Sequence, residues 1–257
     1  AFLKNKDSIL FPDITYSFYP VYCSLFDIKY KTIPLDNDFN IDFKDYLIDH
    51  GGVIFPNPNA PTGIPKKLIE IENFLKASQE SVIIIDEAYV DFGTESTVKL
   101  VKKYENLVVT QSFSKSRSLA GMRLGFAFAN EHLIEGLNRV KNSFNSYPID
   151  RLAQVAGIEA IKDDIYFKKT VKKIIETRVF LEQELILLDF EVLPSGANFI
   201  FAKHKSKNAF IIFKKLRELG VIVRYFEKPE RISQFLRITI GSKEEMQKFI
   251  LILKEIV

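Results

Sequence analysis

Short apolar runs that alternate with helix-like segments constrain the fold of this chain more than any other feature of its sequence. The runs have the length of β-strands and lie at residues 8–10, 53–55, 82–85, 107–110 and 124–129. Between them, apolar residues recur with helical spacing over residues 66–78, 96–104 and 131–141. Continuous apolar strands separated by helices are typical of a parallel sheet covered on both faces. The sequence therefore predicts an α/β fold with a mostly parallel central sheet flanked by helices.

The rest of the chain has a different pattern. A long helix is predicted over residues 164–187, and a shorter one near residues 209–219. The strands predicted around the shorter helix lie near residues 190–192, 198–202, 221–224 and 235–240. We therefore expect a large domain over residues 1–163 and a smaller C-terminal α+β domain over residues 164–257, joined by the long helix.

Composition and charge argue against several classes of function. Hydrophobic residues make up 47% of the chain and charged residues 27%, which is ordinary for a globular protein. The net charge of +3 is spread along the chain, so no basic face for nucleic acid is expected. No apolar run approaches the roughly 20 residues of a membrane helix, and the first residues lack a secretory pattern. We expect a cytoplasmic protein with no nucleic-acid or membrane partner.

The cysteine and the histidines do not suggest a metal site. Cys23 has no second cysteine to bond with, and its aromatic surroundings favour a buried hydrophobic residue over a nucleophile. The histidines His50, His132 and His204 are scattered without metal-ligand spacing. No metal is therefore expected.

Polar residues follow three of the predicted strands. Asn59 comes after residues 53–55, Asp86 after residues 82–85, and Lys115 after residues 107–110. Ligands in such sheets bind at the carboxyl ends of the strands, so one crevice is expected to receive all three residues. Plainer roles remain open, since Asp86 also suits a helix N-cap and most lysines are solvated. No glycine-rich nucleotide-binding loop is present.

Four segments in this order resemble the motif series of class I and II pyridoxal-phosphate-dependent aminotransferases. They are NAPTG at residues 59–63, DEAY at 86–89, SFSK at 112–115 with Arg123, and LRITIG at 236–241. The resemblance extends over nearly the whole chain from Phe11 onward. It implies the fold type I architecture, the cofactor pyridoxal 5'-phosphate, and a homodimer.

Shorter phrases resemble the histidinol-phosphate branch of this family. They are SFNSYP at residues 143–148, VIVR at 221–224 and LRIT at 236–239. This resemblance implies amino-group transfer between histidinol phosphate and 2-oxoglutarate, which yields imidazole-acetol phosphate and glutamate in histidine biosynthesis. Three alternatives stay open: a threonine-phosphate decarboxylase, an aromatic-amino-acid aminotransferase, and a non-catalytic ligand-sensing module or inactive truncated form.

The resemblance implies roles around the cofactor ring. Lys115 would bond to the cofactor aldehyde and later move a substrate proton. Asp86 would face the ring nitrogen, where a negative charge favours the protonated ring. Tyr89 and an amide from Asn59 would hydrogen-bond the ring's 3-oxygen. Tyr16 would stack on the ring, although it also suits a core aromatic residue.

The remaining implied roles concern anions. Ser112, Ser114 and Arg123 would hold the cofactor phosphate, the arginine through charge-assisted hydrogen bonds. Arg224 and Arg237 would receive the substrate phosphate and the carboxylate of the glutamate partner. A surface ion pair is the plainer alternative for each of these two arginines.

The chain departs from the family pattern at two places. Ala60 stands where the family usually has asparagine before Pro-Thr-Gly, so Asn59 would have to supply the amide. The family's N-terminal arm and its Gly-Ser-Asp phosphate loop are not in this sequence. We therefore expect a fragment whose cofactor-phosphate site is completed by residues outside it.

Overall fold

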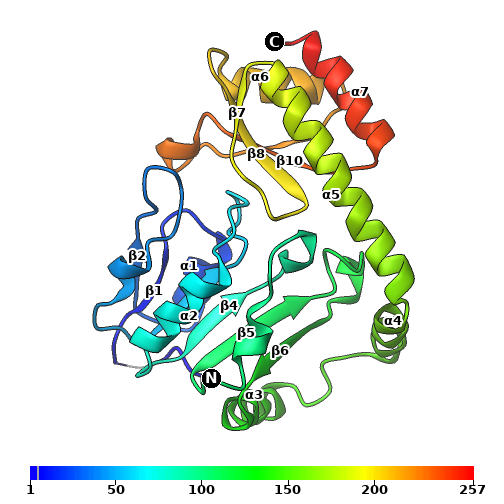
Figure 1. The fold of residues 1–257 in the computed structure, drawn as a ribbon. Coiled ribbons are helices and arrows are strands. Elements are labelled where there is room, and N and C mark those ends of the chain that lie inside the picture. Colours follow the sequence, from blue (N-terminus) through cyan, green and yellow to red (C-terminus); the bar gives the residue numbers. More distant parts are fainter. Residues whose placement is uncertain (5) are drawn as a thin grey trace.

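The computed structural model describes residues 1–4 and 6–257, and within them two β-sheets organise the chain (Figure 1). The larger sheet has six strands in the order β2-β1-β3-β4-β5-β6. Its neighbouring strands are parallel except for β5 and β6, which are antiparallel. This confirms the predicted, mostly parallel central sheet. The strands are β1 (Ile9–Pro12), β2 (Tyr30–Ile33), β3 (Gly52–Pro56), β4 (Ile83–Asp86), β5 (Leu107–Ser112) and β6 (Gly125–Ala129).

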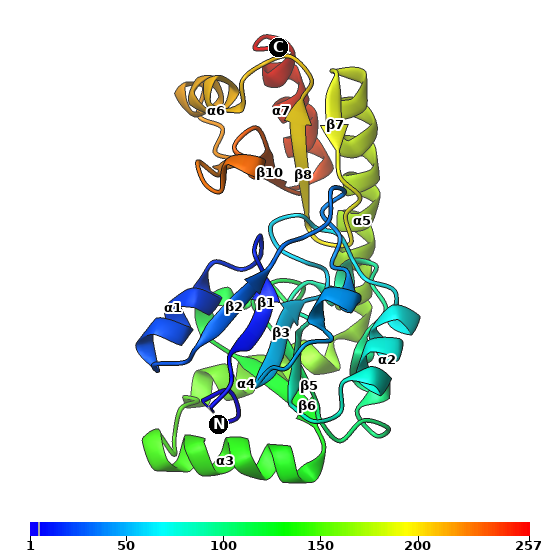
Figure 2. The same cartoon turned by 90° about the vertical axis from the view of Figure 1, so that its left-hand side faces the viewer.

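Helices cover both faces of this sheet, as Figure 2 shows for α1 (Phe18–Leu25) and α2 (Leu68–Ala77) on opposite sides of the strands. Successive side chains of a strand point to opposite faces. Accordingly, Ile9 and Phe11 pack in the cluster that contains Tyr19 of α1, whereas Leu10 packs in the cluster that contains Phe74 of α2. The other helices on this part of the chain are α3 (Glu131–Phe144) and α4 (Arg151–Lys162).

One of the helices predicted between the strands of the large sheet does not form. Residues 96–104 form only a short 3₁₀ helix, η3 (Thr97–Leu100), followed by turns. The buried carboxylate of Glu87 accepts hydrogen bonds from the Thr97 backbone N–H and hydroxyl, at 2.6 and 2.7 Å. These contacts tie the start of the segment to the end of β4. The other 3₁₀ helices here are η1 (Phe43–Tyr46), η2 (Val90–Phe92) and η4 (Ala120–Met122).

The smaller sheet has four strands in the order β7-β8-β10-β9, all antiparallel. The long helix α5 (Asp164–Leu187) has the predicted bounds and runs alongside both sheets (Figure 1). The predicted strand at residues 221–224 is wrong in position, because the Val221 N–H caps the preceding helix by donating to Leu216. The elements are β7 (Phe190–Val192), β8 (Phe199–His204), α6 (Ala209–Glu218), β9 (Arg224–Tyr225), η5 (Glu230–Ile232), β10 (Leu236–Thr239) and α7 (Lys243–Lys254).

A single apolar cluster joins the two sheets. It includes Phe55 and Ile85 of the large sheet together with Phe201 and Phe235 from the C-terminal part. The rings of Phe201 and Phe235 are stacked with their centroids 4.7 Å apart, and Phe235 also meets Phe39 edge-on at 5.3 Å. This shared core fixes the second sheet beside the first. The division into domains at residues 163 and 164 stays a prediction.

The helices give no sign of a membrane-spanning segment. Among the helices of residues 1–4 and 6–257, none combines the length and apolar character that crossing a membrane requires.

Replacing Phe201 should destabilise the whole fold. The side chain is fully buried, so Phe201→Ala leaves a cavity between the sheets and should cost about 3–5 kcal/mol of unfolding free energy. Ile222, which is 81% exposed, provides the control, and Ile222→Ala should change stability by less than about 0.5 kcal/mol. Urea unfolding of both variants measures these differences. A loss below about 1 kcal/mol for Phe201→Ala would contradict a shared core.

Candidate functional site

The parallel register of the large sheet brings three polar segments to one edge. Pro56 of β3 pairs with Asp86 of β4, and Asp86 pairs with Thr110 of β5. Asn59 follows β3 and Lys115 follows β5, each three residues beyond the strand end. The strand ends that sequence analysis singled out are therefore neighbours.

Lys115 and Asp86 lie together with the ring of Tyr89. The Nζ atom of Lys115 is 5.3 Å from the centroid of the Tyr89 ring. The positive charge of Lys115 acts on Asp86 and lowers the pKa of that carboxyl, although burial has the larger and opposite effect. Amine, carboxylate and aromatic ring therefore lie close together at this edge of the sheet, and their roles toward a cofactor stay predictions.

Asp86 is held by a residue that sequence analysis missed. The hydroxyl of buried Tyr19 donates to Asp86 Oδ2 at 3.2 Å, and the Ala88 N–H donates to Oδ1 at 3.0 Å. Burial raises the pKa of Asp86, and these two hydrogen bonds offset only part of that rise. Tyr19 lies three residues after Tyr16, in the first turn of α1, and its nearness to Tyr16 in the sequence was the available signal.

Asp86 does not cap an α-helix in this structure. The next helical element is η2, a 3₁₀ helix whose N-cap residue is Tyr89. Asp86 also forms no ion pair with a cationic side chain within the described part of the chain. It is a half-buried carboxylate at a crevice without a cation bonded to it.

Ser112, Ser114 and Arg123 border the lysine. The Ser114 N–H donates to the Ser112 hydroxyl at 3.0 Å, and the Phe113 N–H donates to the Leu124 carbonyl at 3.1 Å, which brings the arginine's segment alongside. Arg123 has a left-handed backbone (φ 52°) and donates to the Ala120 carbonyl at 2.8 Å. Its guanidinium is exposed and its charge acts on Tyr16. The two serines thus precede the lysine closely in the chain, and the backbone segment of Arg123 lies alongside.

Asn59 is occupied inside the protein. Its Nδ2 donates to the Ile14 carbonyl at 2.9 Å and to the Thr62 hydroxyl at 3.1 Å, while its Oδ1 accepts from the Thr15 hydroxyl at 3.0 Å. The side chain is 2% exposed. In this conformation both amide hydrogens are donated to the protein, so Asn59 anchors the turn before Tyr16 and has no hydrogen left for a cofactor oxygen.

Arg224 and Arg237 lie directly opposite each other on the antiparallel strands β9 and β10. Like charges in this arrangement repel each other. Neither guanidinium forms an ion pair with a carboxylate of residues 1–4 and 6–257, which removes the surface ion pair as an explanation. Both guanidinium groups instead lie near the Phe226 ring, at 5.5 and 5.8 Å. Burial is the main cause that lowers the pKa of Arg237.

A hollow of about 410 Å³ opens between the two sheets at this point. Tyr16, Arg224 and Arg237 line it together with Ala60 and Pro61. Since Tyr16 is 48% exposed, its ring is a wall of the hollow and not a core residue. The hollow offers an aromatic face and two unpaired arginines to an anionic ligand.

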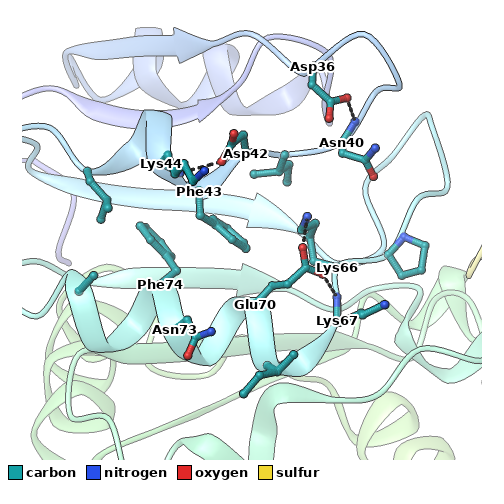
Figure 3. A pocket seen from close by; sticks show the side chains of 15 residues that line it. Asp36, Asn40, Asp42, Phe43, Lys44, Lys66, Lys67, Glu70, Asn73 and Phe74 are labelled. Carbon is teal, nitrogen blue, oxygen red and sulfur yellow. Dashed lines mark hydrogen bonds and ion pairs between the residues drawn. The ribbon is translucent and has the colours of Figure 1, made fainter.

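A larger hollow of about 880 Å³ lies elsewhere, over η1 and α2 (Figure 3). Its lining mixes lysines with carboxylates. Lys66 pairs with Glu70 at 2.5 Å, Asp42 accepts from the Lys44 N–H, and Asp36 accepts from the Asn40 N–H. Unlike the smaller hollow, this surface groove is lined by no arginine among the described residues. No group of His, Cys, Asp or Glu side chains in the described residues is arranged to hold a metal ion.

Comparison with known proteins agrees with this arrangement. Residues 1–253 match the family model "Aminotransferase class I and II". The chain belongs to this family. The chain is 55% identical over 255 residues to a histidinol-phosphate aminotransferase of Acinetobacter baumannii, covering 99% of this chain and 70% of that protein. It is 56% identical over 243 residues to histidinol-phosphate aminotransferase 1 of Hydrogenovibrio crunogenus, covering 95% of this chain and 68% of that protein.

Solved structures of the family share the fold. The histidinol-phosphate aminotransferase of Clostridium acetobutylicum superposes with a TM-score of 0.91 at 25% identity, over 97% of this chain and 77% of that one. The enzyme of Sinorhizobium meliloti, in complex with pyridoxal-5'-phosphate, has a TM-score of 0.88 at 19% identity, over 99% and 72%. The expected family and its fold are therefore confirmed, and this chain is an aminotransferase. The N-terminal segment expected from the family pattern stays a prediction.

Replacing Asp86 by asparagine should stabilise the cofactor-free protein at neutral pH. Because burial raises the pKa of Asp86, its ionised form opposes folding. The stability advantage of Asp86→Asn should be absent well below pH 4, about the pKa of an unfolded aspartate, and should grow as pH rises through the higher folded value. Urea unfolding across this range measures it.

The exposed Asp38 provides the control for this experiment. Asp38→Asn should change stability by less than about 0.5 kcal/mol at neutral pH. An Asp86→Asn protein that is less stable than the parent at pH 7 would contradict a burial penalty at Asp86.

Proposed function

We propose that this aminotransferase transfers an amino group between histidinol phosphate and 2-oxoglutarate with pyridoxal 5'-phosphate as its cofactor. The observation that carries the proposal is the pair of arginines, Arg224 and Arg237, which line the hollow with Tyr16 and form no ion pair with a carboxylate of the described residues. Such a pair suits substrates with a phosphate or carboxylate group. The relatives at 55% and 56% identity are named for histidinol phosphate, and they decide which anionic substrate we propose.

The residues of the crevice fit this cofactor. Asp86 is a carboxylate without a bonded cation, and a protonated ring nitrogen is the kind of partner it lacks. Tyr16 offers an exposed ring for stacking, and Ser112, Ser114 and Arg123 offer donors for a phosphate. When bound, pyridoxal phosphate supplies an aldehyde that links to amines and a ring that draws electrons from the substrate carbon.

Lys115 would have two tasks in this reaction. Its amine would hold the cofactor covalently in the resting enzyme. Once the substrate amine has displaced it, the free amine would take the proton from the substrate Cα and return it one carbon away. The neighbouring Tyr89 ring, 5.3 Å from Nζ, limits where the freed amine moves.

Other residues would orient the ring. Asp86 would hold the ring nitrogen protonated, and Tyr19 would keep the carboxylate pointed at it. The Tyr89 hydroxyl would donate to the 3-oxygen. Asn59, which sequence analysis assigned to the same oxygen, is better explained as the residue that fixes the turn carrying Tyr16. We therefore replace the Asn59 contact in the proposal by this supporting role.

The proposal includes a homodimer in the cytoplasm. Helix α4 exposes a stripe of apolar side chains at every third position, and large exposed apolar patches commonly mark interfaces. A second copy of this chain is the occupant we propose for this face, in keeping with the resemblance to a dimeric family. The side chains are Leu152, Val155, Ile158 and Ile161, between 53% and 77% exposed.

Turnover with three amino substrates tests the proposed function. The cofactor-loaded protein should convert histidinol phosphate with 2-oxoglutarate, and kcat/KM should exceed that for phenylalanine by at least about tenfold, since each 1.4 kcal/mol of lost anion binding is a factor of ten. Release of carbon dioxide from threonine phosphate, or a preference for phenylalanine, would contradict the proposal.

Lysine in place of either arginine should weaken substrate binding. A lysine keeps the charge but loses the two-pronged hydrogen bonding of the guanidinium. Arg224→Lys and Arg237→Lys should therefore raise KM about 10- to 100-fold, the equivalent of about 1.5–3 kcal/mol for a charged hydrogen bond. Steady-state kinetics measures this effect. Arg139, an exposed residue that pairs with Glu135 on α3, is the control, and Arg139→Lys should leave KM unchanged. Equal KM values for all three variants would refute the assignment.

A further inference from the structure

Arg178 of α5 is a buried arginine that joins the two halves of the site. Its side chain is 8% exposed, although arginine is mostly a surface residue. Its Nη1 atom donates to the carbonyl of Phe92 at 2.9 Å and to the carbonyl of Ala197 at 2.7 Å. Phe92 ends η2 beside the large sheet, and Ala197 precedes β8 of the small sheet. One guanidinium therefore ties together the bridging helix and both sheets.

The two carbonyls belong to the segments that carry site residues. Tyr89 lies three residues before Phe92, and Phe199 lies two residues after Ala197. The rings of Tyr89 and Phe199 meet edge-on, with centroids 5.1 Å apart and planes at 88°. Each ring also lies near a cation of the candidate site.

These two cations are Lys115 and Arg237. The Lys115 Nζ lies 5.3 Å from the centroid of the Tyr89 ring, and the Arg237 guanidinium lies 5.1 Å from that of Phe199. A continuous row of contacts therefore runs from the lysine through the two rings to the arginine. The length of this row depends on the positions of the backbone segments that carry the two rings. Arg178 donates to a carbonyl in each of these segments, those of Phe92 and Ala197.

The loop before β8 also packs closely against the loop that follows β3 of the large sheet. The Gly196 N–H donates to the Gly63 carbonyl at 2.8 Å. A Cβ atom at Gly196 would lie only 2.4 Å from the Thr94 hydroxyl oxygen, so this position requires glycine. The close approach allows the Ala197 carbonyl to reach Arg178.

Stability alone does not account for this arginine. Its Nε atom is buried without a hydrogen-bond partner in the described residues, because its ion pair with Glu182, with Nε and Oε1 3.6 Å apart, is too long for a hydrogen bond. Burying a charge with an incomplete set of partners is costly, and an apolar side chain would avoid that cost. A positional task explains why a guanidinium occupies this place.

We propose that Arg178 is a positioning residue for transamination, which sets the separation between Lys115 and Arg237 and so the fit of the substrate anion. The proposal rests on the proposed function, because it takes Arg237 as the residue that binds the substrate. Arg178 itself contacts neither substrate nor cofactor. Its replacement should therefore change substrate binding more than the chemical step.

Two variants and a matched control test this role in the cofactor-loaded protein. Arg178→Gln replaces the guanidinium by a shorter, uncharged side chain, whereas Arg178→Lys keeps a charged donor. The control is Asn106→Ala, which also removes two hydrogen bonds to carbonyls, those of Ser78 and Ser81 at 2.8 and 2.9 Å. Asn106 precedes β5 at the end of the strand opposite to Lys115. It should affect stability alone.

Four quantities are measured for each protein: the thermal unfolding midpoint, KM and kcat for histidinol phosphate, and the Kd of glutarate by calorimetry. Glutarate is a dicarboxylate that binds without reacting. Arg178→Gln should raise KM and the glutarate Kd at least tenfold while kcat falls less than threefold, and Arg178→Lys should restore most of the affinity. Asn106→Ala should lower the midpoint and leave KM and Kd unchanged.

The outcomes separate this proposal from the proposed function. If the unsubstituted enzyme turns over histidinol phosphate but the Arg178 variants keep its KM and glutarate Kd, Arg178 is a structural residue only and the inference is overturned. If the unsubstituted enzyme binds glutarate but does not turn over histidinol phosphate, the proposed substrate fails. The glutarate Kd then still decides the role of Arg178: a rise of at least tenfold in Arg178→Gln supports it, and an unchanged Kd overturns it.

Discussion

The parallel register of β3, β4 and β5 is the constraint on which the rest of this structure depends. Because the three strands run in one direction, the segments after them emerge at one edge of the sheet. The backbone alone therefore brings Asp86 and the Lys115 loop together. Tyr19 of α1, a helix that covers the sheet, then donates a hydrogen bond to the Asp86 carboxylate. The large sheet supplies a lysine and a carboxylate before any substrate-binding residue is added.

In the proposed function, the second sheet adds the anion-binding side of the site. The aromatic cluster around Phe201 and Phe235 fixes its position, so that Arg224 and Arg237 line the hollow together with Tyr16. Two opposed arginines without a carboxylate partner among the described residues are unfavourable for the free protein. The same is true of Asp86, whose raised pKa reflects burial without a bonded cation. These local costs are understandable if each group is placed for a partner that arrives with the ligand.

Much of the fold could be predicted from sequence, because local patterns determine it. The bounds of α5 follow from its apolar spacing and from Asp163, which accepts a hydrogen bond from the Tyr166 N–H at the helix start. The β-branched runs of β4 and β5 similarly mark strands that are buried. Lys115, Asp86 and Arg237 were identifiable because each sits in a motif with a fixed place in the order of elements.

Several of the misses involve contacts that the local sequence pattern does not reveal. Residues 96–104 have a helical pattern, but Glu87 holds their first donors, and the α-helix does not form. Asn59 looked like a ligand contact, yet its amide is used by Ile14 and Thr62. Sequence analysis did not single out Arg178, which is one of several basic residues in the predicted long helix. Sequence periodicity cannot reveal these roles, because each depends on which segments meet in the folded protein.

The most direct test of the account is to find which lysine bonds to the cofactor. The protein loaded with pyridoxal phosphate is reduced with borohydride, digested, and mapped by mass spectrometry. The account predicts that the reduced cofactor is on Lys115 and that Lys115→Ala abolishes the label. A label on another lysine, such as Lys228, which lines the hollow together with Arg224 and Arg237, would contradict the proposed site.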